Sequence, residues 1–258
     1  IADLTEADKK DYIAQARFLR AHFHFEAKRM WNKVPYIDET TTSYDNKTDI
    51  WPMIEADFKF AYDNLGETQT SVGKANKWAA ASYLAKTYMY QKKFADAKAL
   101  YDVIIPTGQT SNGKKYDLQD QYWKNFDVAF ENSAEADFSQ QTQASGTVNG
   151  SAETSYELAY PYGGVWGCCG FFQPSQNLVN AFKTDANGLP FLDGSYNNQS
   201  LKSDEGITSS DPFTNDVTTP LDPRLDWTAG RSGVPYWDYG AHPGRSWIRD
   251  QPYAGPYS

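Results

Sequence analysis

Apolar residues along the first hundred positions recur at steps of three and four, the spacing that places side chains on one face of an α-helix. The first such segment predicts a helix over residues 5–31, in which Thr5 and Asp8 have the spacing of a capping box, with Asp in place of Glu. Its apolar stripe consists of Tyr12, Ala16, Leu19, Phe23, Ala27 and Met30. We expect this stripe to face the core and the helix to end before Pro35.

Three more helices follow in the same pattern. Asp49 is the expected N-cap of the second, which tolerates Pro52 in its first turn. Asn76 is the expected cap of the third, and the fourth is expected to end at Pro106 and Gly108. Their apolar stripes are, in order, Ile50, Ile54, Phe58, Ala61 and Leu65; Trp78, Ala81, Ala85 and Tyr88; and Phe94, Ala97, Tyr101 and Ile104.

The third and fourth helices together resemble a tetratricopeptide repeat (TPR), a helical hairpin that recurs in stacks. Small and aromatic residues take the inner positions of that repeat, at Leu84, Ala85, Tyr88, Phe94, Ala97 and Tyr101. Small residues let two antiparallel helices approach closely, while aromatic rings fill the remaining gaps. Because one hairpin cannot bury its own face, the first and second helices are expected to form the neighbouring hairpin.

The sequence changes character after residue 108. Residues 109–155 are polar, and within them either a short helix or an ordered loop is expected over residues 127–138. Residues 156–258 are rich in Gly, Pro, Asn and aromatic residues, and in this stretch a helix is predicted only over residues 174–183. We therefore predict a mainly α protein with a helical region, residues 1–108, and a loop-rich region, residues 109–258. Long loops in a folded domain are usually functional, and the aromatic content argues against disorder.

Charge and aromatic content narrow the range of functions that fit the sequence. The net charge is -9, so a phosphate backbone would be repelled and nucleic acid is an unfavourable partner. The chain holds 8 Trp, 18 Tyr and 14 Phe, and Trp and Tyr combine an apolar face with a polar tip that suits wet binding surfaces. No stretch approaches the roughly 20 apolar residues of a transmembrane helix. Because the sequence begins with Ile1, we expect it to be an internal part of a longer protein.

No metal or cofactor site is predicted. His22 and His24 are two positions apart on a helix and therefore do not share a face. Cys168 and Cys169 are adjacent, and their Cα atoms, about 3.8 Å apart, are closer than in an ordinary disulfide. Three states stay open for them: two free thiols, a strained vicinal disulfide, or pairing with a cysteine elsewhere.

Several segments, in order along nearly the whole chain, resemble the SusD/RagB family. The first is AQARFLRAHFHFEAKRMWNKVPY, residues 14–36, in which Asn32 stands where the family has a Gly before the Val-Pro turn. The second is IEADFKFAYDNL, residues 54–65. The others are the repeat segments 77–80 and 92–97, the turn Asn187-Gly188-Leu189-Pro190, and residues 222–240, which begin Asp-Pro-Arg-Leu.

The resemblance implies both a fold and a role. The fold would be an α-α superhelix of TPR-like hairpins packed with a loop-rich region. The protein would sit on the cell surface, held in the Bacteroidetes outer membrane by a lipid anchor that is missing from this sequence, and would cap a TonB-dependent SusC-like transporter. It would capture oligosaccharides, or peptides in RagB-like members, and hand them to that transporter without catalysis.

Two aromatic segments form the candidate ligand-binding site. Sugars need flat apolar faces for their C–H groups and planar polar groups for their hydroxyls. The candidates are Tyr160, Tyr162 and Trp166 in the first segment and Tyr236, Trp237 and Trp247 in the second. Trp166, Tyr162 and Trp237 rank first, because glycines flank the first two and Pro-Tyr precedes the third. The alternative is that these rings only pack over the helices.

Two other functions fit the sequence. A TPR scaffold would bind only protein, so it would co-purify with a transporter and bind no small ligand. A helical glycoside hydrolase needs two carboxyl groups that flank the scissile bond, and 33 acidic residues offer many such pairs. Hydrolysis of an oligosaccharide would identify that enzyme. Arg17, Arg20 and Arg224 are expected to be structural, because a guanidinium group ties carbonyls or carboxylates together.

Overall fold

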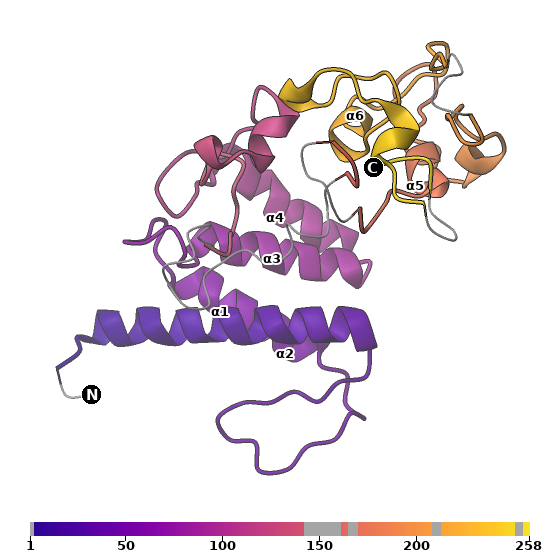
Figure 1. Ribbon diagram of the computed structural model, residues 1–258. Helices are drawn as coiled ribbons and strands as arrows, with labels where there is room; N and C mark the ends of the chain where they lie inside the picture. The colour runs from indigo at the N-terminus through magenta and orange to yellow at the C-terminus, as the bar shows by residue number, and fades with distance from the viewer. Residues whose placement is uncertain (1–2, 142–160, 165–169, 208–212, 251–254) are drawn as a thin grey trace. The chain divides into compact units, whose positions relative to one another are not determined.

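The computed structural model describes residues 3–141, 161–164, 170–207, 213–250 and 255–258, drawn in colour in Figure 1. Helices dominate these residues, where extended pairing is limited to four isolated bridges. The chain divides into two compact units, residues 1–141 and residues 142–258. Among the described helices, none is both long and apolar enough to cross a membrane.

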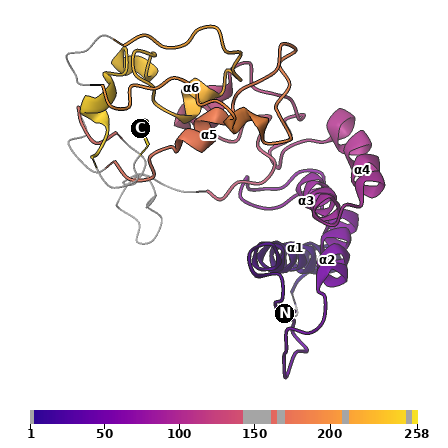
Figure 2. The same cartoon turned by 90° about the vertical axis from the view of Figure 1, so that its right-hand side faces the viewer.

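Four helices in chain order build the first unit, and each packs on the one before it: α1 (Glu6–Trp31), α2 (Trp51–Asn64), α3 (Lys77–Tyr90) and α4 (Phe94–Thr107). Figure 1 shows α3 between α4 and the α1–α2 pair, and Figure 2 views α1 nearly along its axis. Only residues 91–93 separate α3 from α4, and so short a connection makes the two helices an antiparallel hairpin.

α1 buries a different face from the one that the sequence predicts. Its buried residues are Ala14, Phe18, Ala21, Phe25 and Lys28, whereas Tyr12, Ala16, Leu19, Phe23 and Met30 of the predicted stripe are exposed. The two stripes are offset by two positions, about 200° around a helix, so they lie on nearly opposite faces. On the buried face, phenylalanines alternate with alanines and pack against rings from α2 and α3. The capping box of Thr5 and Asp8 is confirmed.

The predicted stripes of α2 and α3 are confirmed. Every residue of the α2 stripe is buried, as are three of the four in α3, and Tyr88 packs against the same core. The Asn76 side chain caps α3 by accepting a hydrogen bond from the Ala79 N–H at 2.8 Å. The Asp49 cap is wrong, because Ile50 precedes the first turn of α2 and the Asp49 carboxylate pairs instead with the Lys28 ammonium, 2.9 Å away.

α4 buries only part of its predicted stripe. Ala97 and Ile104 are buried, whereas Tyr101 is half-buried and Phe94 is exposed. The helix ends at Thr107, and a Cβ at Gly108 would lie 2.5 Å from the Tyr116 ring, so this close approach requires glycine.

Residues 109–141 fold back over the helices of the first unit. They contain two short 3-10 turns, η1 (Tyr122–Phe126) and η2 (Val128–Phe130). The Phe138 ring packs edge-on against Phe18, with 4.9 Å between ring centroids. The Tyr116 hydroxyl donates to the Asp137 carboxylate at 2.7 Å. These contacts explain why the first unit extends to residue 141.

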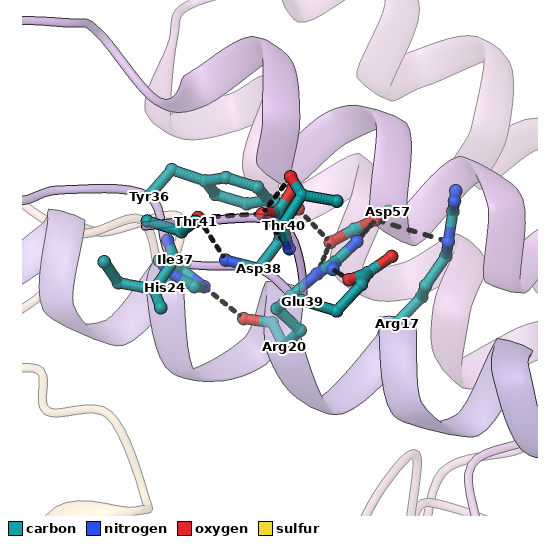
Figure 3. Close-up of polar contacts among 10 residues, drawn as sticks. All are labelled: Arg17, Arg20, His24, Tyr36, Ile37, Asp38, Glu39, Thr40, Thr41 and Asp57. Atoms are coloured by element: carbon teal, nitrogen blue, oxygen red, sulfur yellow. Dashed lines mark hydrogen bonds and ion pairs between the residues drawn. The ribbon is translucent and has the colours of Figure 1, made fainter. Parts of the chain in front are cut away.

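A network of charged groups ties the segment between α1 and α2, residues 32–50, to both helices (Figure 3). Arg20 donates to both carboxylate oxygens of the buried Asp57, at 2.6 and 2.7 Å. The Tyr36 hydroxyl donates to the same carboxylate at 2.7 Å, and Arg20 also donates to Glu39 at 2.6 Å. Arg17 lies 3.8 Å from Asp57. Both arginines are therefore structural, as expected.

Short helical turns separated by loops make up the second unit, as far as the structure describes it. They are α5 (Gln176–Asn180), η4 (Ser195–Asn197), α6 (Leu225–Thr228), η5 (Trp237–Tyr239) and η6 (Gly244–Trp247). The helix predicted over residues 174–183 is thus shorter than expected, because the chain leaves it to form bridges at Lys183 and Thr184. The core of this unit is made of Val179, Leu201, Leu225, Ala229 and Tyr257.

Candidate ligand-binding site

A hollow of about 350 Å³ in the second unit is lined by five aromatic residues together with polar and small ones. We call it the aromatic hollow, and the residues that define it are Phe171, Phe172, Asp226, Trp227, Tyr236 and Trp237. They come from two stretches that are far apart in the sequence, residues 171–172 and residues 226–237. Its volume lies within the range of about 300–1,000 Å³ that is common for small-ligand sites.

The helical turn α6 positions Trp227 on one wall. The Asp222 carboxylate accepts hydrogen bonds from the backbone N–H and the guanidinium Nε of Arg224, both at 2.9 Å, which fixes the turn before α6. Leu225 is buried and anchors the helix. The Trp227 ring, 46% exposed, meets the edge of Trp237 with 5.8 Å between centroids. The expected structural role of Arg224 is thus consistent with its contacts.

Phe172 and Trp237 both line the hollow with a left-handed backbone. Their φ angles are 53° and 48°, a region that bulky residues adopt rarely and at a cost in free energy. Trp237 is held there by a tight loop, in which the Tyr236 N–H donates to the Gly240 carbonyl at 2.7 Å and Pro235 bridges Ala241. Its side chain is 49% exposed. Strain of this kind is concentrated at functional sites.

Two rings outside the lining of the hollow, His242 and Trp247, pack against Tyr236. Tyr236 meets His242 and Trp247 at 5.6 Å each, edge to face. His242 is buried, and its Nδ1 accepts a hydrogen bond from the Gly244 N–H, so its Nε2 carries the proton and donates to the Ser258 hydroxyl. Burial lowers the pKa of His242 to about 4. A neutral, fully hydrogen-bonded imidazole is therefore a packing element of this wall.

Polar groups lie among the rings. The half-exposed Asp226 carboxylate accepts from the Nε of the buried Arg231 at 2.7 Å. The Gln173 amide donates to the Arg249 carbonyl at 3.1 Å, and the Arg249 guanidinium lies over the Phe171 ring at 4.7 Å. Flat apolar faces next to fixed planar polar groups suit a ligand that has both C–H faces and hydroxyls.

The structure brings some of the predicted site residues together. Tyr236 and Trp237 line the hollow, and Trp247 lies behind Tyr236. The Tyr162 N–H donates to the Trp247 carbonyl at 2.8 Å, but the Tyr162 side chain is not part of the wall. Tyr160, Trp166, Cys168 and Cys169 lie outside the described residues.

Sequence reasoning did not single out Phe171, Phe172 and Trp227. All three lie in the aromatic-rich segments, but no local pattern indicates that these segments meet. Among the described residues, no group of three or more His, Cys, Asp and Glu side chains could hold a metal ion. His22 stacks among Phe18, Phe23, Tyr83 and Phe138, while His24 bonds to the Arg20 carbonyl and the Ile37 N–H.

Comparison with known proteins gives related sequences and folds. No family model matches the chain. A SusD-like protein from Bacteroides ovatus is 37% identical over 93 residues, which cover 33% of this chain and 17% of the relative.

A solved SusD-like protein from Bacteroides fragilis superposes with a TM-score of 0.64 at 21% identity, covering 93% of this chain and 47% of that one. Surface glycan-binding protein A from Bacteroides thetaiotaomicron, solved with laminarihexaose, superposes with a TM-score of 0.53 at 19% identity, covering 73% of this chain and 39% of that one. At these identities the likeness is one of fold, and each match spans less than half of the other protein. The chain therefore resembles SusD-like proteins, in sequence over about a third of its length and in fold over most of it.

Proposed function

We propose that the chain is a glycan-binding protein and that the aromatic hollow binds an oligosaccharide without cleaving it. The observation that carries this proposal is the pair of left-handed aromatic residues, Phe172 and Trp237, that line one hollow with Trp227. A folded chain holds bulky residues in this conformation at a cost, and burial offsets that cost only in part, because Phe172 is 76% and Trp237 49% exposed. Stacking on the C–H face of a sugar ring would bury these exposed aromatic rings.

The family supports the class of ligand. Surface glycan-binding protein A, which shares the fold, was solved in complex with laminarihexaose. Neutral sugars need no charged partner, and the hollow combines rings with amide, carboxylate and hydroxyl groups. Laminarihexaose is therefore the first ligand to test.

The wider role follows from the family resemblance. We propose that the longer protein is lipid-anchored at the outer membrane, faces the outside of the cell and hands its ligand to a SusC-like TonB-dependent transporter. The stacked hairpins α1–α4 are then TPR-like units that contact this partner.

The test is calorimetric titration of the 258-residue chain with laminarihexaose and with a panel of other oligosaccharides and oligopeptides. We expect saturable binding of an oligosaccharide with no reducing ends released. Trp237→Ala and Trp227→Ala should each weaken binding about tenfold, roughly 1.4 kcal/mol, because each removes a ring face. Trp31→Ala, which changes an exposed tryptophan of α1, is the matched control and should bind as the wild type does.

Three outcomes contradict the proposal in different ways. Release of reducing ends would make the protein a hydrolase. Binding of peptides alone would place it with the RagB-like members. Oligosaccharide binding that survives both tryptophan changes would move the site away from the aromatic hollow.

A further inference from the structure

A second hollow in the unit of residues 142–258 has a different chemistry from the aromatic one. Its volume is about 650 Å³, and its wall is formed by residues between Lys183 and Pro220. Residues 142–258 contain two lysines, Lys183 and Lys202, and both line this hollow. We call it the lysine hollow.

Lys183 is a buried cation with no carboxylate against it. Its side chain is 8% exposed, and the ammonium donates to the backbone carbonyls of Tyr196, at 3.0 Å, and Gln199. No described carboxylate lies within ion-pair distance of it, whereas Arg224 and Arg231 of the same unit each pair with an aspartate. Buried charges in proteins are normally paired, because an unpaired one loses its hydration. Burial accordingly lowers the pKa of Lys183, and the charge of Asp216 offsets this only in part.

Backbone pairing fixes the position of this lysine. Lys183 bridges Leu221, and Thr184 bridges Pro190, so the segment is held from both sides. The Thr184 N–H also donates to the Pro220 carbonyl at 3.0 Å. The ammonium therefore has a rigid base, which favours a built site over a mobile surface charge.

The other charged groups of the wall leave it with excess positive charge. The Lys202 ammonium donates to the Thr214 carbonyl at 2.7 Å and is exposed. The carboxylate of the wall, Asp216, accepts from the N–H and hydroxyl of Thr218, at 2.8 and 2.7 Å, and from the Thr219 hydroxyl. These bonds keep its pKa well below the usual value and occupy its oxygens. Two cations thus face a single carboxylate that is already satisfied.

Polar and aromatic groups complete the wall. The side-chain amides of Asn198 and Gln199 are exposed and make no side-chain hydrogen bond with the described part of the chain. The Tyr196 ring lies on the same wall. Planar amides beside a ring suit the hydroxyls and C–H groups of a sugar. A charged acceptor on a lysine makes the strongest class of hydrogen bond.

We propose that the lysine hollow binds an acidic saccharide, with a uronic-acid carboxylate on Lys183 and Lys202 and sugar hydroxyls on Asn198 and Gln199. This site is separate from the aromatic hollow and does not depend on what that hollow binds.

The test is calorimetric titration of the 258-residue chain with tetragalacturonate and with the same oligomer methyl-esterified on every carboxylate. We expect the acid to bind at least about tenfold more tightly than the ester, and less tightly as salt is raised. Lys202→Gln should remove most of this preference, because it deletes one of the two cations of the wall. Since Lys202 is exposed, its loss leaves the fold intact. The matched control, Lys10→Gln, changes an exposed lysine of the first unit and should bind as the wild type does.

Lys183→Gln removes two backbone contacts as well as the charge, so a second variant without that effect is needed. Asn198→Ala with Gln199→Ala changes only exposed amides and should weaken binding of both oligomers. The proposal fails if acid and ester bind equally, if Lys202→Gln and the double variant bind the acid as the wild type does, or if inorganic phosphate competes at equal concentration. Trp237→Ala separates the two sites, because it should leave tetragalacturonate binding unchanged.

Discussion

Phe18 and Phe23 are the same residue type on the same helix, five positions apart, in opposite environments. Phe18 is 0% exposed and touches the rings of Phe58, Tyr83 and Phe138, whereas Phe23 is 67% exposed. We expect Phe18→Ala to lower the free energy of unfolding by about 3–5 kcal/mol, through lost burial and a cavity. Phe23→Ala should cost less than about 1 kcal/mol. Urea unfolding followed by circular dichroism measures both, and equal losses would mean that α1 buries its other stripe.

The sequence could not decide between these two phenylalanines. Both stripes of α1 are apolar and both repeat at steps of three and four, so periodicity supports either face. Alanines separate the larger residues on both stripes, Ala14 and Ala21 on the buried one and Ala16 and Ala27 on the other. The choice of face is therefore made only by the packing of α2 and α3 against Phe18 and Phe25.

At the scale of an element, the contribution of the charged network at residues 32–50 to stability can be tested by mutation. Arg20→Met would leave the Asp57 carboxylate buried, with the Tyr36 hydroxyl and a more distant Arg17 as its remaining partners. Removing one partner of a buried ion pair costs about 3–5 kcal/mol, so we expect a loss in this range. The matched control, Arg29→Met, removes an arginine that pairs with the partly exposed Glu26 on the surface of α1 and should cost far less than Arg20→Met.

Thermal unfolding of the two variants, followed by circular dichroism, provides the comparison. A second readout is proteolysis within residues 32–50, which should become faster in Arg20→Met because the network holds this segment on α1 and α2. Equal stability of Arg20→Met and Arg29→Met would show that the network contributes nothing beyond an exposed pair.

Elements with a single apolar stripe were predictable, and contacts between distant segments were not. The α2 and α3 stripes and the Asn76 cap follow from local spacing alone. Arg20 and Asp57 lie 37 positions apart, and no local pattern links them. The same limit applies to the aromatic hollow. Tyr236 and Trp237 could be chosen from one segment, but their meeting with Phe172 depends on the folding of loops that have no period.

At the scale of the whole molecule, two titrating groups, the buried His242 and the half-buried Asp137, give stability opposite dependences on pH. Burial lowers the pKa of His242 to about 4, so the folded state favours its neutral form. The stability it contributes is present above its ordinary pKa of about 6.5 and is lost as the pH falls toward 4. Burial raises the pKa of Asp137 to about 6, and the Tyr116 and Ser82 hydroxyls and Lys86 only partly oppose this. The stability that Asp137 contributes is present at pH values below the ordinary pKa of an aspartate and is lost as the pH rises through 6.

The two pH dependences can be separated by measuring the stability of variants and of the wild type over the same pH range. The difference between them cancels the effect of other groups, such as His22, whose pKa is also lowered by burial. Asp137→Asn keeps an oxygen for the Tyr116 hydroxyl and removes the titration. We therefore expect this variant to gain about 1–2 kcal/mol over the wild type at pH 7 and nothing at pH 4. His242→Gln should show the reverse trend. Its free energy of unfolding should be lowest relative to the wild type at pH 7, and this difference should shrink as the pH falls toward 4. Hydrogen exchange of peptides from residues 3–141 and 170–250 assigns each change to its unit. A gain for Asp137→Asn that does not vary with pH would mean that packing, and not ionisation, sets the cost of this carboxyl.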